Sequence, residues 1–214
     1  MIAVIKGDII ASRKIVQQDK WQVPLKLLLS KWGRSPRNWE LVWGDFFQIE
    51  ISSLESVIRF VFELKSLMKS LDIFPESKTM SPVDVRLAIG IGDKTFSAKR
   101  IAESNGSAFI HAGEKFDLLK REGVTMGIQS DWPDFDEEMN LYLKLVGLFM
   151  DKWSISSAQI ATLAFKKPEA TQSEMGKILG VKQSAVSRRW NRAHIDELLA
   201  VEKIYQKKIK ILST

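Results

Sequence analysis

The N-terminal part of the chain shows apolar runs of strand length between longer segments with helical spacing. Short runs rich in Val, Ile and Phe are typical of strands, and apolar residues three or four positions apart are typical of helices. A first short strand is predicted within MIAVIKGDII, ending near Lys6-Gly7-Asp8. Further strands are predicted at two places within 38–53 around the pair Gly44-Asp45, at 83–92 and at 124–130. Helices are predicted up to Trp32, at 57–71 and at 107–122, and residues 74–82 (FPESKTMSP) are predicted as a loop.

This order of elements contains the split β-α-β pattern of ferredoxin-like domains, in which helices cover one face of a sheet. The stretch 131–138 (DWPDFDEE) is acidic and rich in turn-forming residues, and the segments after it all have helical periodicity. We therefore predict an α+β protein with two domains. A ferredoxin-like domain would span 1–132, and an all-helical domain would span 133–214.

Residues 172–193 (QSEMGKILGVKQSAVSRRWNRA) have the pattern of a helix-turn-helix, which we place at about 171–193. Gly176 would let the two helices cross closely, and Gly180 would adopt the positive φ that the turn needs. Apolar residues would fill the angle between the helices: Met175, Leu179, Val181, Val186 and Trp190. Residues suited to base edges and phosphates would begin the second helix or lie on its outer side: Lys182, Gln183, Ser184, Ser187, Arg188, Asn191 and Arg192.

The charge of the chain favours a polyanionic partner for this segment alone. The whole chain has a net charge of +6, and residues 165–214 hold 11 Lys+Arg against 5 Asp+Glu, so the residues before them are neutral overall. A basic excess confined to one segment predicts double-stranded DNA as the partner. The alternative is an αα-hairpin whose basic face is solvated or binds another protein. Lys182, at the N-cap position of the second helix, cannot accept a backbone hydrogen bond there.

The composition excludes disulfides and thiolate metal sites, because the chain contains no cysteine. No stretch approaches the roughly 18 consecutive apolar residues of a membrane span. The start MIAVIKGDII has no signal-peptide pattern, since a lysine and an aspartate interrupt its apolar run. We therefore expect a cytoplasmic protein that does not engage a membrane.

Two aspartates stand where predicted strands end: Asp8 after the first strand, and Asp45 at the tip of the predicted hairpin. In a ferredoxin-like sheet these elements can lie side by side, which would bring both carboxylates to one edge. Such a pair could hold Mg²⁺ or another divalent cation, with water and phosphate as the other ligands, and could support two-metal phosphoryl chemistry. Aspartates at strand ends and in Gly-Asp turns are also common without any ligand.

The stretches VIKGDIIAS, LVWGDFFQIEI and VRLAIGIGD resemble the core of class III nucleotide cyclases and related palm-like domains. In those families two aspartates bind the metals, and Asp8 and Asp45 match their positions. With its C-terminal helix-turn-helix, the chain is similar over nearly its full length to the SatD-like family of small bacterial proteins, named from an acid-tolerance operon. The helix AFIHAGEKFDLLK lacks the asparagine and arginine of active cyclases, so the resemblance implies binding of a nucleotide or another phosphate ligand rather than cyclase catalysis.

A second phosphate site is conceivable at Ser104, Asn105 and Gly106, which precede the predicted helix at 107–122. Residues of these types favour helix caps and expose N–H groups that attract anions. An ordinary helix cap is the alternative. The nearby GIGDKT (90–95) lacks the spacing of a phosphate-binding P-loop, and we predict a strand end and a turn there.

The sequence thus predicts a non-catalytic bacterial transcription regulator, with a helix-turn-helix that binds DNA and a front domain that senses a ligand or serves assembly. A single such motif usually binds weakly, so a homodimer on paired half-sites is expected. The helix at 194–209 is a candidate dimer or domain-packing surface through Ile195, Leu198, Leu199, Tyr205 and Ile209. The competing hypothesis is a metal-dependent enzyme or binder that acts on nucleotides at Asp8 and Asp45.

Overall fold

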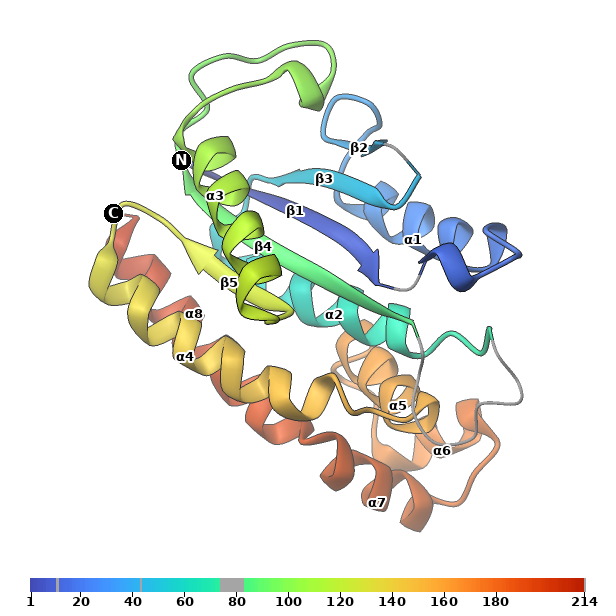
Figure 1. Cartoon of the computed structure of the whole chain (residues 1–214). Helices are drawn as coiled ribbons and strands as arrows, with labels where there is room; N and C mark the ends of the chain where they lie inside the picture. Colours follow the sequence, from blue (N-terminus) through green and yellow to red (C-terminus); the bar gives the residue numbers. More distant parts are fainter. Residues whose placement is uncertain (11, 43, 74–82, 214) are drawn as a thin grey trace.

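The computed structural model describes residues 1–10, 12–42, 44–73 and 83–213, and the predicted loop at 74–82 lies outside them (Figure 1). Five strands form one mixed sheet in the order β2-β3-β1-β4-β5. Neighbouring strands are antiparallel except β4 and β5, which are parallel. The strands are β1 (Ile2–Ile10), β2 (Trp39–Val42), β3 (Phe46–Ile51), β4 (Asp84–Gly92) and β5 (Met126–Gln129).

Helices connect the strands, except β2 and β3, which form a hairpin, and helices make up the C-terminal part after β5. The protein is therefore α+β, as its pattern of apolar residues predicts. The helices are α1 (Asp19–Trp32), α2 (Val57–Lys69), α3 (Ser107–Glu122), α4 (Pro133–Met150), α5 (Ile155–Lys166), α6 (Gln172–Leu179), α7 (Gln183–Ala193) and α8 (Ile195–Leu212).

Helices cover both faces of the sheet, whereas the sequence predicts cover on one face only. Successive strand residues point to opposite faces, so Ala3 and Ile5 join the large core beneath α1 and α2, while Val4 packs with Ala108 and Ala112 of α3. Figure 1 shows α3 in front of the sheet and α1 and α2 behind it. The helix that follows β4 thus crosses to the face that the split β-α-β unit leaves open.

The C-terminal helices share their core with the sheet. One hydrophobic cluster contains Trp21 of α1, Ile5 of β1, Val186 of α7 and Ile209 of α8, and α5 packs along α2. The hydroxyl of Tyr205 donates to the carbonyl of Leu54 at 2.8 Å. The segments 1–132 and 133–214 therefore pack as one body around a common core.

The apolar face of α8 is used inside the chain. Ile195, Leu198, Tyr205 and Ile209 are fully buried, and Leu199 is half-buried. Of the two roles predicted for this surface, domain packing is the one that the structure has. Among the described residues, no helix is both long and apolar enough to cross a membrane.

Candidate functional site

The α6–α7 unit consists of two short helices joined by the turn 180–182. A capping box starts α6: the Oγ1 of Thr171 accepts the N–H of Glu174 at 3.3 Å, and the carboxylate of Glu174 accepts the N–H of Thr171 at 2.8 Å. Gly180 ends α6 with φ 65° and ψ 32°, the left-handed conformation predicted for it. Lys182 is the N-cap of α7 and makes no capping bond with its side chain. Because capping interactions define both ends of α6, they also set the direction of the turn and of α7 after it.

The two helices cross at Gly176. A Cβ on this residue would stand 2.7 Å from the carbonyl oxygen of Val181 and 3.5 Å from Cγ2 of Val186. The space between the helices is filled by Met175 and Val186, of which at most 1% is exposed. Helix α5 packs against α7 as a third helix. The angle between α6 and α7 is therefore set by close packing.

All seven residues predicted to contact DNA lie on α7 or at its N-cap. Ser187 is half-buried, and the others are exposed: Lys182, Gln183, Ser184, Arg188, Asn191 and Arg192. The side-chain amide of Gln183 donates to Gln172 at 2.8 Å and so joins the starts of the two helices. The opposite side of α7 carries the buried Val186. A continuous polar face of α7 is thus open to solvent.

Trp190 is less buried than the pattern predicts. It is half-buried, and its indole N–H donates to the carboxylate of Asp196 at 3.0 Å. Arg189, outside the predicted DNA-contacting set, is a half-buried third arginine of this helix. The period of 3.6 residues places Trp190 on the margin of the buried face, where its ring packs and its N–H still finds a polar partner.

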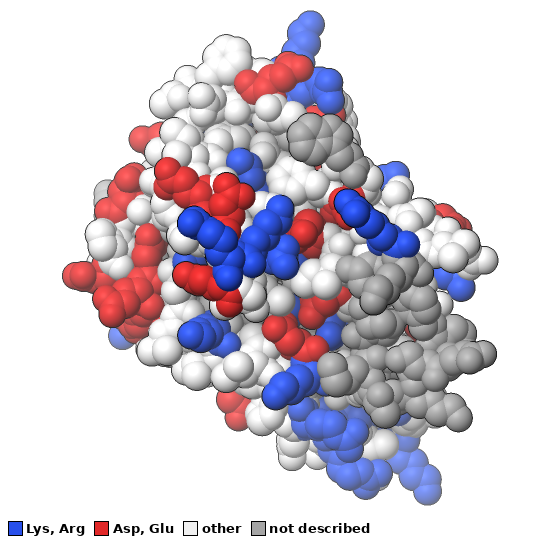
Figure 2. All heavy atoms as spheres, in the orientation of Figure 1, with Lys and Arg blue, Asp and Glu red and all other residues white. Residues whose placement is uncertain are grey.

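The charge of α7 itself is positive, although exposed carboxylates lie on its neighbours, at Glu174 on α6 and at Asp196 and Glu197 on α8. The helix itself contains no Asp or Glu, and exposed cations lie on it and on α6: Lys177, Lys182, Arg188 and Arg192. Figure 2 shows Lys and Arg gathered at the lower edge of the molecule, where α7 lies in Figure 1. The partial positive charge at the N-terminus of α7 adds to this field. Such a surface attracts polyanions.

A pocket of about 510 Å³ borders the C-terminal end of α7. It joins Arg192 to Lys152, Ser154 and Trp153 from the connection between α4 and α5. Sequence reasoning missed Lys152 because it lies forty residues before Arg192 and carries no local motif. The pocket brings a second cation next to the predicted DNA-contacting face.

The two predicted metal ligands, Asp8 and Asp45, lie near one another but have different partners. Asp8 on β1 sits opposite Arg86 on β4, whose Nη1 donates to both carboxylate oxygens at 3.1 and 3.0 Å. Asp45 accepts the hydroxyl of Ser12 at 2.5 Å. Burial raises the pKa of Asp8 above its usual value, and the charge of Asp45 adds to the rise, while Arg86 and Lys120 oppose it.

This donor set does not fit a divalent cation. Both oxygens of Asp8 already face a guanidinium, so a metal would have to displace Arg86 or share its carboxylate with a like charge. Within the described residues, no three His, Cys, Asp or Glu side chains are grouped closely enough to hold a metal. Divalent cations such as Mg²⁺ prefer several oxygen ligands with water completing the shell. The geometry is that of a salt bridge beside a turn.

Ser104, Asn105 and Gly106 form hydrogen bonds within the loop that precedes α3. The hydroxyl of Ser104 accepts the N–H of Ala98 at 3.1 Å, and the side-chain oxygen of Asn105 accepts the N–H of Gly106 at 2.8 Å. Gly106 is needed for packing, because a Cβ there would stand 2.2 Å from the carbonyl oxygen of Asp93. The groups that would cradle a phosphate are therefore occupied within the loop, and α3 begins after Gly106 with no side-chain capping bond, so the predicted alternative of an ordinary helix cap is not formed either.

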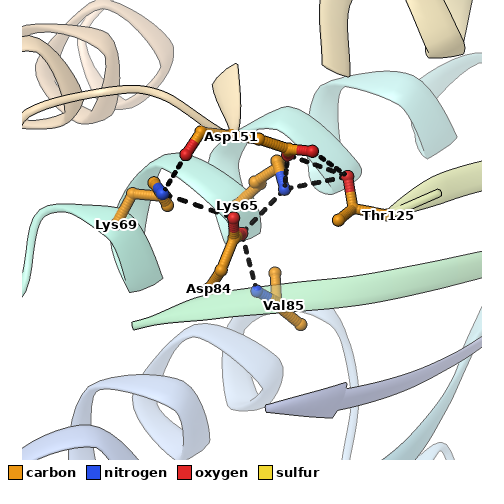
Figure 3. Close-up of polar contacts among 6 residues, drawn as sticks. All are labelled: Lys65, Lys69, Asp84, Val85, Thr125 and Asp151. Carbon is orange, nitrogen blue, oxygen red and sulfur yellow. Dashed lines mark hydrogen bonds and ion pairs between the residues drawn. The ribbon is translucent and has the colours of Figure 1, made fainter. Parts of the chain in front are cut away.

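A buried ionic network links the sheet to the end of α4, and no sequence motif predicts it. Figure 3 shows Lys65 and Lys69 of α2 pointing toward Asp84 at the start of β4 and toward Asp151 after α4. The Nζ of Lys65 lies 2.7 Å from carboxylate oxygens of both Asp84 and Asp151. Lys69 donates to the carbonyl of Asp151 at 2.6 Å, and burial lowers its pKa. The network fixes the start of the connection that leads to α5.

Comparison with known proteins finds no match for this chain, either among protein-family models or among curated proteins. The resemblance to nucleotide cyclases and to the SatD-like family therefore stays a prediction.

Proposed function

We propose that this protein binds double-stranded DNA through a helix-turn-helix formed by α6 and α7, with α7 as the recognition helix. The observation that carries the proposal is the exposed face of α7: Ser184, Arg188, Asn191 and Arg192 lie on a helix without acidic residues, on the side opposite Val186. Side chains of these types hydrogen-bond to base edges in the major groove and to phosphates.

The dimensions suit this role. With 11 residues, α7 is about 16 Å long at a rise of about 1.5 Å per residue. The major groove is about 12 Å wide and admits one α-helix. Lys177 on α6, the helix that precedes α7, is exposed and would contact a phosphate beside the groove.

Residues 1–132 would form a rigid support for the recognition helix α7. They would also bind a regulatory ligand or an assembly partner. Their first four strands have the order β2-β3-β1-β4 with antiparallel neighbours, and α1 and α2 pack together, which supports a ferredoxin-like domain. A transcription regulator of bacterial type, as in the SatD-like resemblance, would need such a second part for assembly or ligand sensing. The shared core would pass a change in the sheet directly to α5 and α7.

A mobility-shift assay with genomic fragments tests the proposal, and it should be repeated at 50, 100 and 200 mM salt. We expect shifted complexes whose affinity falls steeply with salt, because released counterions drive phosphate contacts. Absence of any shift at the lowest salt would contradict DNA binding. Incubation with nucleoside triphosphates and Mg²⁺ or Mn²⁺, followed by product analysis, tests the competing nucleotide chemistry at Asp8 and Asp45, and we expect no turnover.

A further inference from the structure

Helix α4 presents an apolar stripe to solvent. Leu141, Leu145 and Leu148 are 54%, 49% and 58% exposed, although the opposite side of the same helix is buried against β5 and α8. Their spacing of four and then three residues is that of the a and d positions of a coiled coil. Three exposed leucines in that register form a seam for another helix.

The charges on either side of this stripe differ in sign. The exposed acidic residues Asp134 and Glu137 precede it, and the exposed Lys152 follows it. Figure 2 shows acidic side chains gathered at the left edge of the molecule, where α4 begins in Figure 1. A second helix packed antiparallel to α4 would therefore complement the charges of α4 if it were acidic near its N-terminus and basic near its C-terminus.

The helix with that arrangement is α4 itself. We propose that α4 is a homodimer interface in which two copies of the chain pair antiparallel about a two-fold axis at Leu145. Leu145 would face its own copy, and Leu141 would lie within about one residue of the level of Leu148 in the other chain. Glu137 lies eight residues before Leu145, and Lys152 lies seven residues after it, just beyond the end of α4 at Met150, so this register brings Glu137 of one chain within about one residue of the level of Lys152 of the other. A two-fold interface must be self-complementary in this way.

A pocket lies where the incoming lysine would arrive. It has a volume of about 280 Å³ between the start of α4 and the end of α8, and Asp134, Glu138 and Ile211 are among its lining residues. Lys208 also lines this pocket, and Asp134 with the apolar lining suits a second lysine, whose stem is apolar and whose end is charged. Glu138 is already paired with Lys208 at 2.6 Å, which leaves Glu137 as the residue to change in a test. Ile211, 69% exposed in one chain, would be covered in the dimer.

Sedimentation equilibrium from 1 to 100 µM without DNA tests the interface independently of DNA binding. We expect the wild-type chain to dimerise reversibly and Leu145→Glu to weaken dimerisation by at least roughly 30-fold, the effect of a hot-spot residue. Leu27→Glu is the matched control, because Leu27 is a 65% exposed leucine on α1, and it should behave as wild type. Circular dichroism of each variant checks that its fold is retained.

The charge swap tests the antiparallel register. Lys152→Glu should weaken dimerisation several-fold by placing like charges opposite one another twice, and Glu137→Lys combined with Lys152→Glu should restore it. A wild-type chain that stays monomeric at 100 µM would overturn the proposal. So would a double variant that dimerises no better than Lys152→Glu alone, or a Leu27→Glu variant as impaired as Leu145→Glu.

Discussion

Gly176 and Val181 approach each other so closely that a methyl group on the glycine would stand 2.7 Å from the carbonyl oxygen of the valine. Gly→Ala in a helix normally stabilises by about 0.5–1 kcal/mol. At this position the added carbon would push α7 away from α6. We expect Gly176→Ala to destabilise the protein by about 1–3 kcal/mol, measured by urea denaturation, and to weaken DNA binding.

The matched control for this change is Gly147→Ala in α4. The nearest atom to a Cβ there is Cε of Met126 at 3.8 Å, which is ordinary contact. The control should be neutral or stabilising by up to about 1 kcal/mol. If both substitutions changed the free energy of unfolding equally, the close contact at Gly176 would not be what sets the angle between α6 and α7.

The buried network in Figure 3 predicts a large loss of stability when one carboxylate is removed. Asp84→Ala takes a partner from both Lys65 and Lys69, whose side chains are 0% and 2% exposed. Breaking a buried ion pair in this way costs about 3–5 kcal/mol, because a charge stays buried without compensation. Asp93→Ala, at a 72% exposed carboxylate, should change the free energy of unfolding by less than about 0.5 kcal/mol.

Asp8 predicts a pH dependence of stability. Burial raises its folded-state pKa above the unfolded value of about 4. Between these two pKa values the folded state binds more protons than the unfolded state, so the contribution of Asp8 to stability falls as pH rises. Asp8→Asn removes this titration.

The stability of wild type relative to Asp8→Asn should therefore decrease from pH 4 toward neutrality. Urea denaturation of both proteins at intervals of one pH unit measures the difference. An advantage of wild type that grows with pH would mean that the ion pair with Arg86 outweighs burial.

Replacing Trp190 should cause a moderate loss of stability, because this side chain is half-buried and its N–H donates to Asp196. We expect Trp190→Ala to cost about 1–3 kcal/mol, less than the ~3–5 kcal/mol of a fully buried aromatic. Trp21→Ala, at a fully buried tryptophan of α1, supplies that comparison. Equal losses in thermal denaturation would show that Trp190 anchors α7 as a core residue does.

Local patterns in the sequence predicted the elements well where periodicity and turn chemistry agree. The hairpin around Gly44 and the left-handed end of α6 at Gly180 are both present, since glycine is the residue that such conformations favour. The wedge residues Met175 and Val186 are buried as predicted. The outward set on α7 followed from the same helical period.

What the sequence did not predict depends on contacts between distant residues. The pairing of Asp8 with Arg86 needs the register of β1 against β4, and the meeting of Lys65 with Asp151 needs the position of α4 beside α2. The role of Gly90 was also missed: a Cβ there would stand 2.2 Å from the carbonyl oxygen of Ala108, so α3 can rest on β4 only if that position is glycine. Periodicity carries no information on which elements meet.

The salt dependence of DNA affinity, with and without two arginines of α7, tests the central claim most directly. Fluorescence anisotropy on a mixed-sequence duplex gives the slope of log K against log salt, to which each phosphate contact contributes about one unit. We expect Arg188→Ala combined with Arg192→Ala to weaken binding and to lower the slope by one to two units, roughly one for each arginine that contacts a phosphate. Lys20→Ala combined with Lys26→Ala, exposed on α1, removes the same charge and should change neither quantity. If the arginine variant binds every duplex as wild type does, α7 is not the DNA-reading helix.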